Sequence, residues 1–177
     1  DEDMNILKEK EVSVAHNPSS NLKLASGFAP VAKMEDLDIN VTIGTDGSAS
    51  NNNINMIEEI HLASLLAKGV SQNPKALDAY TSLKLATVNG AKAIRRIDLG
   101  KIAEGYTADI AIYDLNAAHM SPINDLISSV VYSLQGSDCN TVIIDGKIVM
   151  EDKKILNINE EDLKREVRER ADRLING

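Results

Sequence analysis

Asp46 is the residue whose position in this sequence most favours chemistry. It follows a short β-branched segment, residues 39–43, and lies in a polar break over residues 44–48. In folds of alternating strands and helices, functional side chains gather where parallel strands end. A carboxylate there can bind a divalent metal and accept a proton from the water that the metal activates. Asp-Gly is also a common turn, and an anion cradle before a helix is a third possibility.

His16 stands in a similar place, at the end of the β-branched segment 12–15. A histidine at a strand end can bind substrate or metal, but a structural hydrogen bond is the commoner role. His61 and His119 are expected to be structural or exposed. The sequence contains no H-x-H, H-E-x-x-H, C-x-x-C or G-x-S-x-G motif. Because a catalytic zinc normally takes three protein ligands, the residues alone predict part of a site.

The elements that would position these residues are predicted from hydrophobic periodicity and turn residues. The first half alternates strands and helices, with a loop over residues 16–21 and a strand over 39–43. Long helices are expected over 53–68, which Gly69 would end, and over 76–94. Shorter helices are expected within 1–11 and from Ala29 to Leu37.

The second half has a different pattern. A strand is predicted over residues 108–113, a helix over 122–134, and a hairpin over 141–150, where Asp145-Gly146 is a strong turn signal. The tail 160–176 is a clear amphipathic helix with a cap at Asn159. We expect its stripe of Leu163, Val167, Leu174 and Ile175 to pack against other elements.

Composition excludes several classes of protein. The chain has 177 residues, of which 43% are hydrophobic and 3% aromatic, and its formal net charge is −8. An acidic chain with few aromatic residues is not expected to bind nucleic acid or an anionic membrane. The single cysteine, Cys139, suits a cytoplasmic protein. The chain begins at Asp1, in what is predicted to be a helix, so we expect it to be cut from a longer protein.

Several segments resemble the amidohydrolase superfamily, closest to its 5′-methylthioadenosine/S-adenosylhomocysteine deaminases and triazine chlorohydrolases. These segments occur in family order along nearly the whole chain, at residues 12–27, 42–59, 86–91, 100–109 and 142–147. The resemblance implies an α/β fold: the C-terminal portion of a metal-dependent (β/α)8 barrel with the C-terminal segment of a small β-sandwich. Residues 1–99 would be the last βα units of the barrel. Residues 100–158 would be the returning sandwich segment with an inserted helix, and 159–177 a C-terminal helix.

The resemblance also implies roles for individual residues. Asp46 corresponds to the aspartate that binds the metal and helps to activate water, so it is expected to be both catalytic and a metal ligand. His16, Asn17, Ser20 and Asn21 match the segment that borders the substrate pocket. The family's other ligands and its proton-shuttling glutamate belong to strands that this chain does not contain.

On this basis the longer protein is expected to be a cytoplasmic, metal-dependent aminohydrolase, with zinc as the expected metal. It would deaminate an adenine-type nucleoside such as S-adenosylhomocysteine or 5′-methylthioadenosine. The alternatives are a chlorohydrolase or a guanine- or cytosine-type deaminase or, for this chain alone, a non-catalytic folding or interaction module. The chain alone is expected to bind metal weakly or not at all, to be inactive, and to form a homo-oligomer through exposed β-edges.

Overall fold

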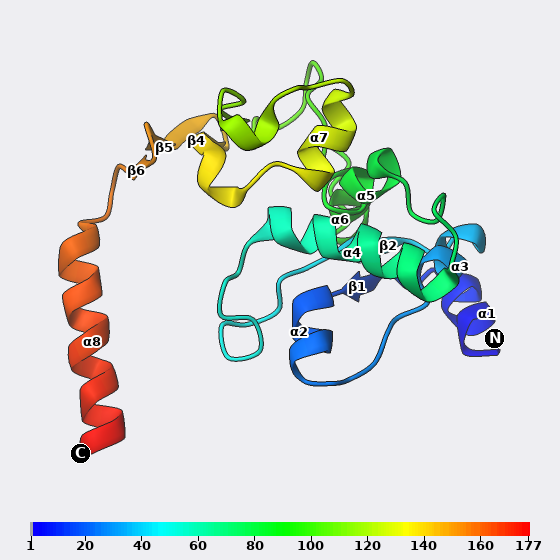
Figure 1. The fold of residues 1–177 in the computed structure, drawn as a ribbon, viewed down its shortest axis with the longest axis horizontal. Helices are drawn as coiled ribbons and strands as arrows, with labels where there is room; N and C mark the ends of the chain where they lie inside the picture. Colours follow the sequence, from blue (N-terminus) through cyan, green and yellow to red (C-terminus); the bar gives the residue numbers. More distant parts are fainter. Residues whose placement is uncertain (1) are drawn as a thin grey trace. The chain divides into compact units, whose positions relative to one another are not determined.

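The computed structural model describes residues 2–177, which form two compact units (Figure 1). The first unit comprises the chain up to Thr107 together with Leu115–Asp138, and the second comprises Ala108–Asp114 with Cys139–Gly177. We describe each unit by itself. The first contains the described residues of the predicted barrel segment, 2–99, and the second contains the strands that lie within the predicted sandwich segment.

Two short parallel strands lie at the centre of the first unit. Strand β1 (Val14–His16) pairs with β2 (Val41–Ile43), with His16 opposite Ile43. Val41 is completely buried and Ile43 nearly so, which agrees with the β-branched patterns that predicted both strands. Because the strands are parallel, both end at the same edge. The chain that follows His16 and the chain that follows Ile43 therefore start side by side.

Short helices precede and connect these strands: α1 (Glu2–Glu9) lies before β1, and α2 (Pro18–Lys23) and α3 (Val31–Asp36) lie between β1 and β2. The first and third agree with prediction, as far as residues 2–177 can test it. The loop predicted over residues 16–21 is wrong, because α2 begins at Pro18. Proline is well tolerated in the first helical turn, where its missing N–H would have no helical partner. The serines and asparagine of this segment are thereby held on a helix.

The long helix α4 (Met56–Ser71) packs against this core. Asn55 caps its start by accepting a hydrogen bond from the backbone N–H of Ile57. Gly69 does not end the helix as predicted, since the chain continues to Ser71 and turns at Gln72 in a left-handed conformation. Helix α4 contributes four apolar residues to the core, together with two buried polar residues: Ile57, Ile60, Ala63, Ala67, Glu59 and Ser64.

The single helix predicted over 76–94 is two helices, α5 (Ala79–Leu85) and α6 (Val88–Ala93). The chain breaks at Thr87, whose dihedral angles (φ −125°, ψ −94°) are not helical. Asp78 caps α5 by accepting from the N–H of Thr81 at 2.8 Å. The predicted 122–134 helix is shorter, α7 (Leu126–Tyr132), and has 3₁₀ turns before and after it, at Ala118–Met120 and Gly136–Asp138.

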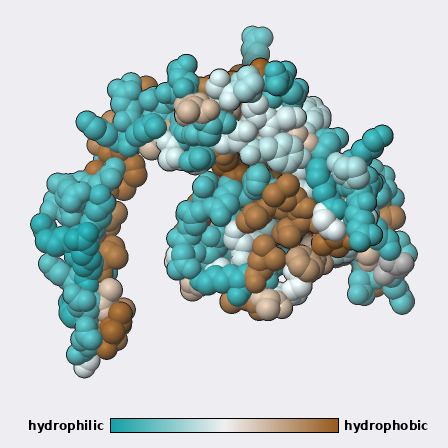
Figure 2. All heavy atoms as spheres, in the orientation of Figure 1, coloured by the Kyte–Doolittle hydropathy of each residue, from teal (hydrophilic) through white to brown (hydrophobic). Residues whose placement is uncertain are grey.

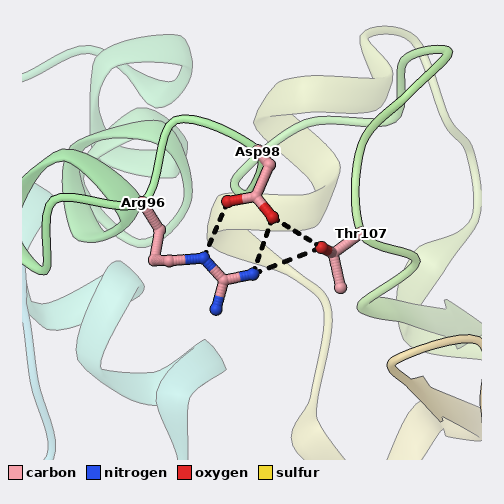
Figure 3. Close-up of polar contacts among 3 residues, drawn as sticks. All are labelled: Arg96, Asp98 and Thr107. Atoms are coloured by element: carbon pink, nitrogen blue, oxygen red, sulfur yellow. Dashed lines mark hydrogen bonds and ion pairs between the residues drawn. The ribbon is translucent and has the colours of Figure 1, made fainter.

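A cluster of hydrogen bonds among Arg96, Asp98 and Thr107 holds together residues 96–107, where the first part of this unit ends (Figure 3). Arg96 donates from Nε and from a terminal nitrogen to the two Asp98 carboxylate oxygens, each at 2.7 Å, and Thr107 Oγ1 donates to Asp98 at 2.8 Å. The arginine and threonine hydrogen bonds hold the pKa of the Asp98 carboxyl well below its ordinary value. The backbone N–H of Thr107 also bonds to the Asp98 carbonyl, so residues 98–107 form a closed loop.

The second unit is an antiparallel meander of four strands followed by a helix. Its strands are β3 (Ile110–Tyr113), β4 (Cys139–Ile144), β5 (Lys147–Glu151) and β6 (Lys154–Ile155), paired in that order. The predicted Asp145-Gly146 turn joins β4 and β5. Both turn residues have positive φ, 50° and 71°, as a type I′ hairpin turn requires.

Helix α8 (Glu160–Asn176) confirms the predicted tail helix and its Asn159 cap. On the surface of α8, Arg170 forms an ion pair with Glu166, and Arg165 forms one with Asp162. No residue of α8 is buried, and Figure 2 shows its apolar residues along one side of the helix. The expected packing of this stripe is therefore not seen in the structure. Over residues 2–177, no helix combines the length and apolar character that a membrane crossing requires.

Candidate active site

The Asp46 side chain lies just beyond the carboxyl end of β2. Two serine hydroxyls donate to one of its oxygens, Oδ2: Ser20 Oγ at 2.7 Å and Ser50 Oγ at 2.6 Å. Ser20 belongs to α2, after β1, and Ser50 follows in the same loop as Asp46. The serine bonds leave the second oxygen, Oδ1, to other partners. Asp46 has a positive φ of 59°, a conformation that Asp tolerates better than most residues.

The hydrogen bonds around Asp46 favour its charged form. Ser50, then Ser20, then the backbone N–H of Gly47 lower the pKa of the Asp46 carboxyl below its usual value. The side chain is exposed, so desolvation opposes them only slightly. Asp46 is thus an ionised, oriented and accessible carboxylate at neutral pH, and such a group can bind a cation or accept a proton.

The structure brings Ser20 to Asp46 but places the other predicted residues differently. His16 is 4% exposed, and its Nδ1 atom is buried with no hydrogen-bond partner among residues 2–177. Burial lowers the pKa of its imidazole, although the negative charge of Glu59 partly opposes the shift. His16 and Asn21 both line a narrow cavity that also contacts Ala63 and Ala67 of α4.

Asn17 lies across the end of β2 at Gly44. A methyl group built on Gly44 would stand 2.5 Å from Asn17 Oδ1, which is closer than a methyl carbon and an oxygen can approach without a clash. Glycine is therefore required at this position if Asn17 is to keep its place. The close approach puts the Asn17 side chain next to the loop that carries Asp46.

The sequence analysis did not select four residues at or near Asp46: Gly44, Ser50, Asn51 and Glu59. Asn51 donates to the Thr45 carbonyl next to Asp46 and to the Glu59 carboxylate. Ser50 gave a weak signal, because it lies four residues after Asp46 in a serine-rich loop. Glu59 gave a stronger one, because it stands on the same helical face as Ala63, four residues on, which is buried. A charged residue on an apolar face is informative, since burial of its charge requires partners.

The residues present fit one ligand of a metal centre. Asp46 offers an ionised oxygen donor of the type that divalent metals accept. Among residues 2–177, no group of three or more His, Cys, Asp or Glu side chains lies close enough together to hold a metal ion. The donor set in this part of the chain is thus the single carboxylate.

Comparison with known proteins identifies the family. The model of the amidohydrolase family matches residues 1–149. The chain belongs to this family. The resemblance on which the sequence prediction rested is confirmed.

Similar proteins include enzymes named as adenine-nucleoside deaminases. The chain is 51% identical to 5-methylthioadenosine/S-adenosylhomocysteine deaminase of Caldanaerobacter subterraneus over 178 residues, which cover 100% of the chain and 41% of the relative. It is 52% identical to 5′-deoxyadenosine deaminase of Methanosphaera stadtmanae, covering 92% of the chain and 38% of the relative. The chain therefore spans about two fifths of the length of these relatives.

Solved structures agree with this assignment. An adenosine deaminase from Xanthomonas campestris with bound zinc is similar at a TM-score of 0.94 and 37% identity, over 97% of this chain and 39% of that one. Atrazine chlorohydrolase from Arthrobacter aurescens, complexed with zinc, is similar at a TM-score of 0.88 and 27% identity, over 95% and 38%. The mixed α/β fold of this chain is thus that of a matching part of amidohydrolase structures.

Proposed function

We propose that this chain is part of a metal-dependent aminohydrolase that deaminates an adenine-type nucleoside, and that Asp46 is its metal ligand and proton acceptor. The observation that carries the proposal is the Asp46 carboxylate itself. It is ionised, it stands at the carboxyl edge of two parallel strands, and two serines hold its Oδ2 atom. Membership of the amidohydrolase family supports this role.

The residues of this chain would each perform a limited part of the reaction. A divalent metal, zinc in the similar structures, lowers the pKa of water towards neutrality and so supplies the nucleophile. Asp46 would hold the metal through the oxygen that the serines leave open, and would accept a proton from the attacking water. Ser20 and Ser50 would keep the carboxylate oriented. Water would add to the ring carbon, and the amino group would gain a proton and leave as ammonia as the carbon–nitrogen bond breaks, so that the ring keeps the oxygen as a carbonyl.

The nucleoside substrate is proposed from the relatives. Proteins about 50% identical to this chain are named as deaminases of 5-methylthioadenosine/S-adenosylhomocysteine and of 5′-deoxyadenosine. We assign His16, Asn17, Ser20 and Asn21 to the border of the substrate pocket, as the resemblance implies. The structure supports Asn17 and Ser20 most, because both lie beside the Asp46 loop. His16 and Asn21 line the narrow cavity and would support Asn17 and Ser20 from there.

Dehalogenation is the second candidate. It is favoured by the likeness to atrazine chlorohydrolase, in which the matched residues are 27% identical. The same attack by water on an aromatic carbon would then expel chloride. Deamination ranks first, because the relatives named as deaminases are much more similar in sequence.

The rest of the protein would complete the site. We propose that β1 and β2 are neighbouring strands of a (β/α)8 barrel within residues 1–99, and that the β3–β6 meander belongs to a small β-sandwich within residues 100–158. The remaining metal ligands and the general acid would come from other barrel strands. Chain 1–177 alone would then act as a folding or interaction module and associate through its sheet edges. A cytoplasmic homo-oligomer remains part of the proposal.

The test is to measure turnover by the full-length protein loaded with zinc. S-Adenosylhomocysteine, 5′-methylthioadenosine, 5′-deoxyadenosine and a chloro-triazine are each offered, and ammonia and chloride are measured. We expect one ammonia per nucleoside converted and no chloride. Release of chloride without ammonia would favour dehalogenation, and neither product from any substrate would contradict the proposal. Chain 1–177, assayed in parallel, should release neither.

A further inference from the structure

Glu59 is a carboxylate in the core of the first unit. It lies in α4 and is 1% exposed. A charged side chain that is buried to this extent requires hydrogen-bond partners. Each of its oxygens accepts one hydrogen bond. The backbone N–H of Ser19 donates to Oε2 at 3.0 Å, and Asn51 Nδ2 donates to Oε1 at 2.7 Å. The buried charge is thus held by two specific donors.

These two donors come from the two segments that form the candidate active site. Ser19 lies beside Ser20, in the helix that follows β1, and Asn51 lies within the loop that carries Asp46 between β2 and α4. Asn51 Nδ2 also donates to the Thr45 carbonyl at 2.9 Å, immediately before Asp46. Glu59 is therefore connected to both partners of the Ser20–Asp46 hydrogen bond: to the Ser20 segment through Ser19, and to the Asp46 loop through Asn51.

Asn51 extends this connection further along the loop. Its Oδ1 atom accepts from the backbone N–H groups of Asn53 and Ile54, each at 3.2 Å. Asn51 is 4% exposed, so these bonds are protected from competing water. The loop between β2 and α4 is consequently folded around one amide side chain, and Glu59 holds that amide.

We propose that Glu59 is a positioning residue for the reaction: it fixes the Asp46 carboxylate by clamping the two segments that meet at Asp46. Its two hydrogen bonds go to Ser19 and Asn51, not to the Asp46 carboxylate, and it acts through these two residues. This inference rests on the proposed function of Asp46. Because partners of metal ligands typically change metal affinity or activity by about 10- to 100-fold, the expected effect is large enough to measure.

Ser64 provides a matched control in the same helix. Like Glu59 it is polar and buried, with 0% exposure, but its hydroxyl donates to the Leu77 carbonyl at 2.9 Å and lies 2.8 Å from Tyr132 Oη. Its partners belong to other parts of the unit than the Asp46 loop. A substitution there disturbs the packing and hydrogen bonding of α4 without releasing either segment.

The experiment compares Glu59→Gln with Ser64→Ala in the full-length protein. Glutamine keeps the shape of the side chain but replaces one acceptor oxygen with an NH₂ group, which opposes one of the two donors. Four quantities are measured: amide hydrogen exchange of segments 17–24 and 45–54 in the metal-free protein, zinc affinity by chelator competition, kcat and KM. Glu59→Asp serves if the glutamine variant does not fold, because the shorter side chain cannot reach both donors.

For Glu59→Gln we expect exchange in one or both segments to rise about tenfold or more, zinc affinity to fall about 10- to 100-fold and kcat to fall by a similar factor, with KM nearly unchanged. Ser64→Ala should leave all of these close to wild type at an equal loss of thermal stability. The proposal is overturned if exchange and zinc affinity are unchanged in the Glu59 variant, or if Ser64→Ala changes them equally. A wild-type protein without nucleoside turnover would contradict the proposed function, and exchange and zinc affinity would still decide the role of Glu59.

Discussion

The two units of this chain differ in one property above all, the presence of a core. The first buries large apolar side chains completely or nearly so, among them Val41, Leu85, Met120 and Val131. In the second, across Ala108–Asp114 and Cys139–Gly177, no residue is buried. Both units nevertheless have regular hydrogen-bonded elements. The strands of the second unit are thus paired through their backbones although none of their side chains is buried.

The difference shows what each unit requires from outside itself. In the second unit the strands carry apolar side chains that are 42–52% exposed: Ile112, Ile144, Ile148 and Ile155. A small sheet needs an apolar face packed against another layer for independent stability. The first unit has such packing, because α4 and α5 lie against β2. We therefore expect the first unit to be the stable one and to carry the chemistry.

The largest expected effect tests the contrast in burial directly. Leu85→Ala, at a completely buried side chain, should lower the free energy of unfolding of chain 1–177 by about 2–5 kcal/mol. Leu163→Ala in α8 removes the same atoms from a side chain that is 48% exposed, and should cost less than about 1 kcal/mol. Urea denaturation followed by circular dichroism measures both. Equal losses would show that α8 has a packing partner and would restore the original expectation for its stripe.

A pair of glycines offers a test inside the first unit. Gly44→Ala should displace Asn17 and raise KM for the nucleoside about tenfold in the full-length protein, because the new methyl group would overlap Asn17 Oδ1. Gly69→Ala is the control: nothing lies within 4 Å of its added methyl group, and it should stabilise α4 by about 0.5–1 kcal/mol. Steady-state kinetics and thermal melting separate the two. An unchanged KM in the Gly44 variant would remove Asn17 from the proposed pocket.

The smallest expected effect is a pH dependence confined to the first unit. Burial lowers the pKa of His16 below the ordinary value, so the unfolded chain binds a proton at a higher pH than the folded chain. The contribution of His16 to stability is therefore complete above about pH 6.5 and is lost as the pH falls through its folded-state pKa. Urea unfolding between about pH 7.5 and pH 5 should show this loss, and His16→Asn should reduce it.

Nuclear magnetic resonance gives a check that does not depend on the variant. A His16 ring that titrates at or above about pH 6.5 would contradict the assigned burial of its side chain.

The sequence was sufficient for features that depend on local patterns. The β-branched segments before His16 and Gly44 are strands, Asp145-Gly146 is the hairpin turn, and Asn159 begins the tail helix. Each follows from two to six neighbouring residues. Asp46 could be selected for the same reason, because its position after a buried strand is visible in the sequence.

Features that depend on tertiary contacts could not be predicted in this way. The Ser/Asn-rich segment after His16 suggested a loop, but Pro18 starts a helix that buries Ser20. Gly69 suggested a helix end, but the helix continues past it. The bonds from Ser20 to Asp46 and from Ser19 to Glu59 join residues 26 and 40 positions apart, and no local pattern reports such pairs.

The proposed role of Asp46 in the chemistry is tested by ammonia release from the zinc-loaded full-length protein with Asp46→Asn. The matched control is Asp145→Asn, an exposed aspartate in the β4–β5 turn of the second unit, where asparagine also tolerates positive φ. We expect Asp46→Asn to keep the melting temperature and to lose turnover by about 10³-fold or more, while Asp145→Asn stays near wild type. Turnover by Asp46→Asn within about tenfold of wild type would show that Asp46 is neither the metal ligand nor the proton acceptor.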